Sequence, residues 1–159
     1  MDADVRWLDE DEERLWRAWV RLNAEMTLAL QRGVQADGLS MPDFGVLVHL
    51  TDDPSGRARV SDLAGLMQWE RSRVSHQVAR MERRGLVRRV GCPSDGRGAF
   101  VEVTDAGREA ITRAAPGHVR TVRRLLFDVL CADERAGLGR TVERLLAVHT
   151  TAEDPAETA

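Results

Sequence analysis

Between residues 60 and 104 the periodicity of the sequence changes from helical to strand-like, and this change constrains the fold more than any other feature. The short helical stretch RVSDLAGLM is followed, after a turn at Gln68-Trp69, by a longer one that runs from about Glu70 to Arg84 and stops at Gly85. Two β-type runs come next, LVRRV and FVEVT, with the glycine-rich loop GCPSDGRGA between them. Two helices, a tight turn and a hairpin in this order predict a helix-turn-helix with a protruding wing.

Two further helical patterns precede this segment. The first is expected from about Asp9 to Val34, where apolar residues recur at spacings near 3.5. The next begins at Ser40, which forms a capping-box pattern with Asp43. Ser61 is expected to cap the short helix that leads into the turn.

After the hairpin, the patterns predict one helix over about 105–130 and another over about 133–148. The fold class is therefore mainly α with a small β-hairpin wing: a winged helix-turn-helix with additional terminal helices. The terminal helices carry more apolar surface than a monomer of 159 residues would easily cover, so residues 1–35 and 105–150 are expected to form a helical dimerisation region. Residues 151–159 are expected to be a flexible tail.

Positive charge is concentrated in the predicted helix-turn-helix and wing. The stretch from Arg57 to Arg97 holds ten arginines and four acids, a net charge of +6, which leaves −9 for the rest of a chain whose total is −3. All basic residues of the chain are arginines, whose planar guanidinium groups suit phosphate and guanine. The asymmetry indicates a local surface built for an anionic partner.

The arginine-rich helix has one apolar and one polar face. Val74, Val78 and Met81 form the buried seam, and acids are scarcer on the opposite face than on an ordinary solvated helix. That opposite face mixes cations with groups that can address base edges: Ser72, Arg73, His76, Arg80 and Arg83, with Arg71 and Gln77 at its margins. This helix is expected in the major groove of double-stranded DNA, and residues 40–104 are expected to form the DNA-binding domain.

The loop between the two strands carries Arg97 at its tip, flanked by glycines. An arginine on such a loop can enter a narrow minor groove, where the negative potential is enhanced. A winged helix used as a protein-interaction module, without DNA binding, is the alternative; it would not need the basic helix face.

Other chemistries find little support in the sequence. The histidines at positions 49, 76, 118 and 149 are scattered, and no metalloprotease, serine-hydrolase or phosphate-loop motif is present, so the chain is not expected to be an enzyme. No cofactor and no metal are expected. Cys92 lies near Arg88 and Arg89, which would lower its pKa, so an oxidation-sensing role for Cys92 or Cys131 stays open.

The location expected from the sequence is the cytoplasm. The N-terminus is acidic, whereas a signal peptide begins with basic and then apolar residues. No apolar run reaches the roughly 18 residues that a membrane span needs. Two cysteines far apart in the sequence also fit a reducing compartment.

Three stretches of this chain, taken in order, resemble the MarR-type winged helix-turn-helix regulators. GLSMPDFGVLVHL resembles the second helix of that family, and VSDLAGLM with RSRVSHQVARMERRGLVRR resembles its helix-turn-helix. SDGRGAFVEVTDAG matches its wing pattern, an aspartate and an arginine two residues apart and then V-T-x-x-G. The resemblance covers roughly residues 9–148.

The resemblance implies a homodimer that binds a pseudo-palindromic DNA site and acts as a repressor of transcription. It places base reading on Ser72, Arg73, His76 and Gln77, and it places the wing arginine at Arg97, oriented by Asp95. Gly96 departs from the family pattern, since many members have an arginine there. The full candidate set for DNA contact is Arg71, Ser72, Arg73, Ser75, His76, Gln77, Arg80, Asp95 and Arg97.

The resemblance also implies a small-molecule effector, often phenolic, that binds between the dimerisation helices and the winged domain and releases DNA. Trp16 and Trp19 lie on the first predicted helix and provide two large aromatic rings where packing needs one. We expect an effector to bind beside them.

Overall fold

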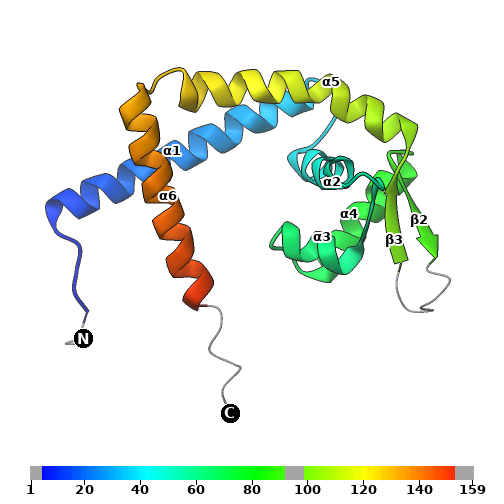
Figure 1. The fold of residues 1–159 in the computed structure, drawn as a ribbon, viewed down its shortest axis with the longest axis horizontal. Helices are drawn as coiled ribbons and strands as arrows, with labels where there is room; N and C mark the ends of the chain where they lie inside the picture. The colour runs from blue at the N-terminus through cyan, green and yellow to red at the C-terminus, as the bar shows by residue number, and fades with distance from the viewer. Residues whose placement is uncertain (1–4, 92–98, 153–159) are drawn as a thin grey trace, which may run out of the picture. The chain divides into compact units, whose positions relative to one another are not determined.

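The computed structural model describes residues 5–91 and 99–152 (Figure 1). Helices make up most of these residues, and a small antiparallel sheet lies in the middle of the chain, as the sequence predicted. The elements in chain order are α1 (Glu10–Gln35), α2 (Met41–Asp52), β1 (Arg57–Arg59), α3 (Val60–Leu66), α4 (Arg71–Arg83), β2 (Val87–Gly91), β3 (Ala99–Val103), α5 (Asp105–Val122), the π-helix η1 (Arg123–Phe127) and α6 (Ala132–Ala152). None of the described helices combines the length and the apolar character that crossing a bilayer requires.

The chain forms two compact units, which divide between Thr121 and Val122. The first unit contains α1 to α4, the sheet and α5 up to Thr121. The second begins at Val122, the last residue of α5, and contains η1 and α6. The predicted winged helix-turn-helix lies entirely within the first unit.

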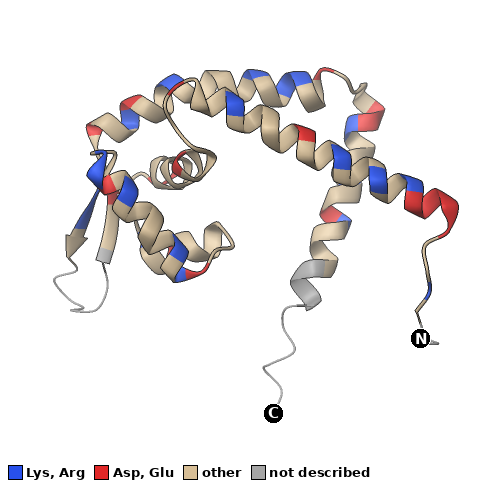
Figure 2. Cartoon of the chain, turned by 180° about the vertical axis from the view of Figure 1, so that it is seen from behind, with Lys and Arg blue, Asp and Glu red and all other residues tan. Residues whose placement is uncertain are grey.

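Capping boxes mark the starts of α1 and α2 in the first unit. Asp9 caps α1 in a capping box with Glu12, and the acidic residues that follow complement the positive end of the helix dipole (Figure 2). Ser40 and Asp43 form the predicted capping box of α2. Ser61 is not the N-cap of α3: the helix begins at Val60 and its N-cap is Arg59, because the chain passes directly from a strand into the helix.

That strand, β1, was not predicted. A strand of three residues is too short to show an alternating pattern in the sequence. Gly56 turns the chain at φ +66°, and β1 then pairs with β3 through Arg57 opposite Glu102 and Arg59 opposite Phe100. The sheet order is β1-β3-β2, so the predicted hairpin has an additional edge strand.

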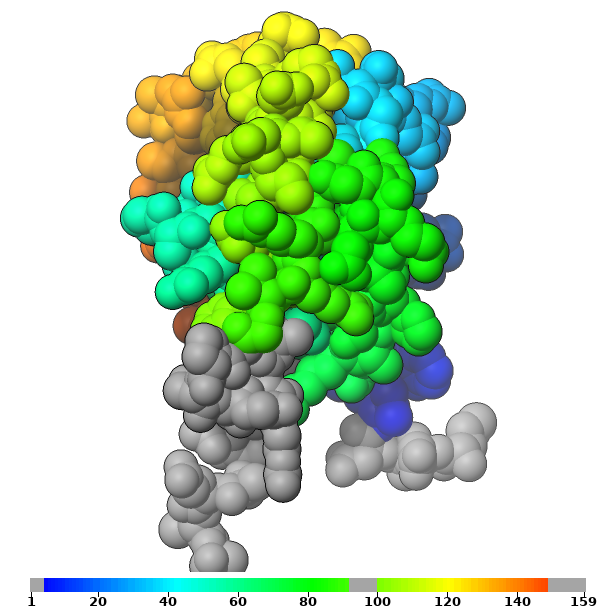
Figure 3. All heavy atoms as spheres, turned by 90° about the vertical axis from the view of Figure 1, so that its right-hand side faces the viewer, coloured from blue at the N-terminus to red at the C-terminus, as the bar shows by residue number. Residues whose placement is uncertain are grey.

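The core of the first unit lies where α2, α3, α4 and the sheet meet, around Leu47, Leu50 and Leu63. The first turn of α5 closes this core: a Cβ at Gly107 would collide with the carbonyl oxygen of Leu86. In the space-filling view, the green atoms of α4 and the sheet pack directly beneath the yellow-green atoms of α5 (Figure 3). Helix α4 is thereby packed through its buried side against this core.

The last two helices differ from their predicted boundaries. The helix expected over about 105–130 is α-helical only to Val122 and continues as the π-helix η1, in which Asp128 donates from its backbone N–H to the carbonyl of Arg123. Helix α6 reaches Ala152, beyond the expected end near residue 148, so Thr151 and Ala152 belong to a helix and not to a tail. Residues 153–159 of the predicted tail lie outside the described residues.

Candidate nucleic-acid interface

Helix α4 has the predicted division into two faces. Val74, Val78 and Met81 are fully buried in the core. The opposite side is exposed and rich in arginine. Its exposed members are Arg71, Ser72, Arg73, His76, Arg80 and Arg83.

The turn before α4 is built by backbone hydrogen bonds. Gln68 adopts a positive φ of 52°, its N–H donates to the carbonyl of Gly65, and the N–H of Trp69 donates to the carbonyl of Ala64 at 2.9 Å. An open hollow of about 910 Å³ lies at this turn. It is lined by Ser61, Ala64, Gly65, Gln68, Trp69, Glu70, Arg71, Ser72 and Arg73.

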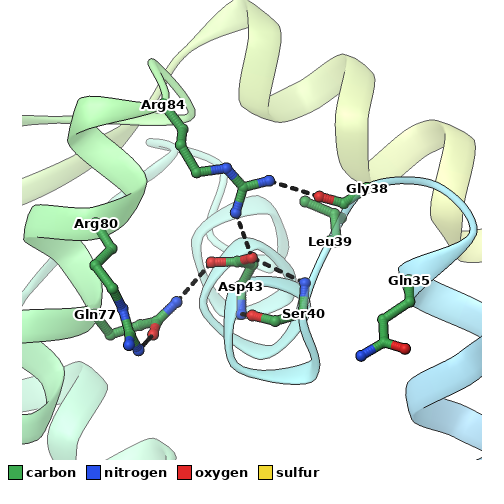
Figure 4. Close-up of a pocket in the computed structure, with 8 residues that line it drawn as sticks. All are labelled: Gln35, Gly38, Leu39, Ser40, Asp43, Gln77, Arg80 and Arg84. Carbon is green, nitrogen blue, oxygen red and sulfur yellow. Dashed lines mark hydrogen bonds and ion pairs between the residues drawn. The ribbon is translucent and has the colours of Figure 1, made fainter.

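One predicted base-reading residue is not on the exposed face. Gln77 is only 1% exposed, and its Nε2 donates a 2.6 Å hydrogen bond to Oδ1 of Asp43, a buried residue of α2 (Figure 4). Its Oε1 accepts a hydrogen bond from the guanidinium of Arg80. Both ends of the amide are therefore occupied within the protein, and the expectation that Gln77 is a base-reading residue is corrected.

The sequence contained a signal for this placement. Position 77 is three residues after Val74 and four before Met81, which is the spacing of the apolar seam itself. A polar residue on a seam is buried when a partner is available, because an unpaired amide in the core costs free energy. The partner, Asp43, is 34 residues away and could not be identified from spacing.

Asp43, at the start of α2, is bonded to Gln77 within α4 and to Arg84 at the end of α4. Beyond its capping-box bonds with Ser40, its Oδ2 accepts a 2.7 Å hydrogen bond from Nη1 of Arg84, at the end of α4. Arg84 also donates from Nη2 to the carbonyl of Gly38 at 2.6 Å. Burial opposes ionisation of Asp43, but the hydrogen bonds from Ser40 and the ion pair with Arg84 outweigh it and hold the pKa of the carboxyl below its usual range.

The residues of this network line a pocket of about 390 Å³ between the α1–α2 loop and α4 (Figure 4). The stick view shows Gln77 of α4 and Arg84 at the end of α4 reaching different oxygens of the Asp43 carboxylate. Asp43, which the sequence marked only as a capping residue, thus fixes the position of α4 on α2.

Several arginines of the basic stretch have structural partners. Arg88 forms a two-point ion pair with Glu102 across the sheet, at 2.9 and 3.2 Å. Arg89 donates to the backbone carbonyl of Ser75 at 3.0 Å, and its own N–H donates to Glu82. Ser75 is half-buried beside this contact. The candidates Asp95 and Arg97, and also Cys92, lie outside the described residues.

The remaining candidates lie elsewhere in the chain. Trp16 and Trp19 are 57% and 44% exposed on α1. Cys131 is exposed. In the parts of the chain that the structure describes, no three or more His, Cys, Asp or Glu side chains come together as they would to bind a metal ion.

Comparison with known proteins identifies relatives that cover nearly all of the chain. A family model described as the MarR family matches residues 37–98. AbsC, a MarR family transcriptional regulator from Streptomyces coelicolor, is similar at 38% identity and a TM-score of 0.87, over 94% of this chain and 100% of that one. Sco3205, a MarR family transcriptional regulator from the same organism solved in complex with DNA, is similar at 38% identity and a TM-score of 0.86, over 98% and 96% of the two chains.

A more distant structure shares the fold. It is a mutant MarR from E. coli complexed with operator DNA, 20% identical, with a TM-score of 0.75 over 87% of this chain and 99% of that one. No curated protein sequence matches this chain.

Proposed function

Because the chain belongs to the MarR family of transcriptional regulators, we propose that it binds double-stranded DNA as a homodimer and represses transcription from a pseudo-palindromic site. Members of this family are regulators and not enzymes. In this proposal α4 of each subunit enters the major groove, the wing with Arg97 contacts the adjacent minor groove, and the protein acts in the cytoplasm.

The observation that carries the proposal is the exposed face of α4. Four arginines, a serine and a histidine share that face. Glu82, the acidic residue within α4, is turned toward Arg89 of the wing and does not neutralise them. Arginine and serine side chains on one helix can contact both phosphates and base edges. Sco3205, a relative with the same fold, has been solved bound to DNA.

A second copy of the chain is the partner that the terminal helices fit. Helix α1 exposes a row of large apolar side chains: Leu15, Trp16, Trp19, Val20, Leu22 and Leu28. Helix α6 exposes another: Val142, Leu145, Leu146 and Val148. Rows of exposed large apolar side chains are typical of helices that are covered in obligate interfaces. We assign residues 1–35 and 105–150 to dimerisation and residues 40–104 to DNA binding.

A dimer sets the spacing of the two recognition helices. Helices that enter successive major grooves on one side of the duplex lie about 34 Å apart. A small molecule bound beside Trp16 and Trp19 on α1 would alter that spacing through the dimer helices. We therefore propose that an aromatic effector binds there and lowers DNA affinity.

Selection of bound sequences from random duplexes tests the proposed function. The expected result is enrichment of an inverted repeat whose half-sites are about 10 base pairs apart, with an affinity that falls steeply as salt concentration rises. Failure to enrich any sequence, together with salt-independent or undetectable binding to duplex DNA, would contradict the proposal and favour a winged helix that binds protein partners.

A further inference from the structure

Arg73 is stacked on an aromatic ring at the start of the recognition helix. Its guanidinium carbon lies 3.9 Å from the centroid of the Trp69 ring. This distance is well inside the roughly 6 Å at which a cation is attracted to the face of an indole. Trp69 lies in the turn that connects α3 to α4, and Arg73 lies one helical turn later, in α4.

The ring is fixed to the scaffold of the helix-turn-helix. Trp69 is half-buried and packs against the core of the winged domain, and its backbone N–H is bonded to the carbonyl of Ala64. Arg73, by contrast, is exposed. A long arginine side chain on a helix surface samples many rotamers unless a neighbour restricts it. The ring is therefore a rigid platform for an otherwise mobile cation.

Stacking leaves the hydrogen-bond donors of Arg73 available. A guanidinium that lies with its face on a ring keeps its N–H groups at the rim, directed away from the ring. Other arginines of the same domain use their donors within the protein: Arg84 with Asp43 and Gly38, and Arg88 with Glu102. In the described part of the chain, no acidic side chain forms an ion pair with Arg73.

We infer that Trp69 is a positioning residue for sequence reading: its ring holds the Arg73 guanidinium at the mouth of the hollow at the turn, ready to donate two hydrogen bonds to O6 and N7 of one guanine. The inference rests on the proposed function and deepens it. The rotamer freedom of Arg73 is reduced before DNA binds, so less is lost when the two bonds form. The platform also restricts where the donors point, which favours one base position over its neighbours.

The experiment measures base discrimination by the full-length dimer. Sequence selection with the unaltered protein first identifies the site, and Arg73→Ala identifies the base pair that Arg73 reads. The test variants are then Trp69→Leu, which keeps apolar bulk without a ring, and Trp69→Phe, which keeps a smaller ring. Trp7→Leu is the matched control, because Trp7 is 83% exposed and lies outside the winged domain.

The readout is the ratio of affinities for the selected site and for the site altered at that base pair in both half-sites. This ratio does not depend on the fraction of protein that is folded. Trp69→Leu is expected to lower the ratio by about two- to fivefold per half-site, the equivalent of an exposed cation–π contact, and Trp69→Phe by less. Trp69→Leu is expected to add nothing in an Arg73→Ala background, and Trp7→Leu should leave the ratio unchanged.

Two failures are distinguishable. If the unaltered protein binds no duplex DNA, the proposed function itself is wrong. If it binds DNA and Arg73→Ala relaxes one base position, but Trp69→Leu leaves the discrimination at that position unchanged or weakens all sequences equally, the positioning role of Trp69 is overturned while the proposed function stands.

Discussion

The side-chain amide of Gln77 donates to Oδ1 of Asp43 at 2.6 Å and so joins the recognition helix to the start of α2. Both residues are almost completely buried, at 1% and 2% exposed. A hydrogen bond to a buried carboxylate is stronger than one between neutral groups, and its loss leaves a charged acceptor without a partner. This contact therefore determines how the buried side of α4 is positioned against α2.

Replacing Gln77 with leucine is expected to destabilise the fold, because the apolar side chain leaves one oxygen of Asp43 without its donor. The expected loss is about 1–3 kcal/mol in the free energy of unfolding, measured by urea denaturation. Gln31→Leu, at an exposed position of α1, is the control and should change stability far less. If the Gln77→Leu protein were as stable as the unaltered protein but had lost preference for an adenine in its DNA site, Gln77 would be a base-reading residue and not a structural one.

Asp43 makes the stability of the winged domain depend on acidity. Its pKa in the folded protein is below its usual value, because bonds from Ser40 and Arg84 outweigh the effect of burial. A carboxyl with a lowered folded pKa contributes stability that is fully present above the unfolded pKa, about 3.9, and that is lost as pH falls through the folded value.

The variant Asp43→Asn should therefore be less stable than the unaltered protein at pH 5–7 by a constant difference of about 1–3 kcal/mol. That difference should shrink as the pH is lowered below about 4, because Asp43 itself becomes protonated there. Urea denaturation of both proteins over this pH range provides the measurement. A difference that stays the same at low pH would mean that the Asp43 charge does not stabilise the fold.

The sequence was sufficient for elements that depend on local chemistry. Apolar periodicity predicted where α1 begins, the Ser40–Asp43 capping box predicted where α2 begins, and the apolar seam predicted which side of α4 is buried. The sequence was insufficient where the outcome depends on residues far apart along the chain. The edge strand β1 forms because Arg57 and Arg59 pair with residues of β3 that lie more than 40 positions later in the chain. The number of arginines in the sequence also overestimated how many are available to bind DNA, because Arg84, Arg88 and Arg89 form hydrogen bonds within the protein.

Dimerisation is expected to depend on the apolar row of α1. The double variant Leu15→Glu/Leu22→Glu places two charges on that row and should shift the protein to monomers or to aggregates in sedimentation velocity. Arg21→Glu is the control, because Arg21 is exposed on the same helix and pairs with Glu25.

Deletion of residues 1–32 should abolish dimerisation and leave an aggregating or unfolded product. A stable, soluble monomer from that deletion would show that α1 is not needed to cover the terminal helices.

An effector bound beside Trp16 and Trp19 should be visible in tryptophan fluorescence. Titration with a series of aromatic acids should change the emission in parallel with the loss of DNA binding. Replacing both Trp16 and Trp19 with phenylalanine should reduce the fluorescence response and weaken the release of DNA, whereas Trp7→Phe should affect neither. A compound that releases DNA with equal potency from the Trp16→Phe/Trp19→Phe protein would place the effector elsewhere.

Substitutions in the recognition helix and in the wing are expected to change DNA binding in different ways. Arg97, which lies outside the described residues, is proposed to contribute mainly charge and groove-shape recognition. Arg97→Ala should therefore weaken binding to all sequences. It should also reduce the dependence of log affinity on log salt concentration, by about one unit for each phosphate that Arg97 no longer neutralises in each subunit. Arg73, on the exposed face of α4, is proposed to read a base.

The most direct measurement is a binding titration of Arg73→Ala against the selected site and a scrambled duplex, at several salt concentrations, beside Arg113→Ala as an exposed-arginine control on α5. We expect Arg73→Ala to lose about 1–3 kcal/mol per half-site on the selected duplex, with a much smaller loss on the scrambled one. Arg113→Ala should bind both duplexes as the unaltered protein does. Equal weakening on both duplexes would make Arg73 a phosphate contact, and unchanged DNA affinity would contradict the assignment of α4 as the DNA-reading helix.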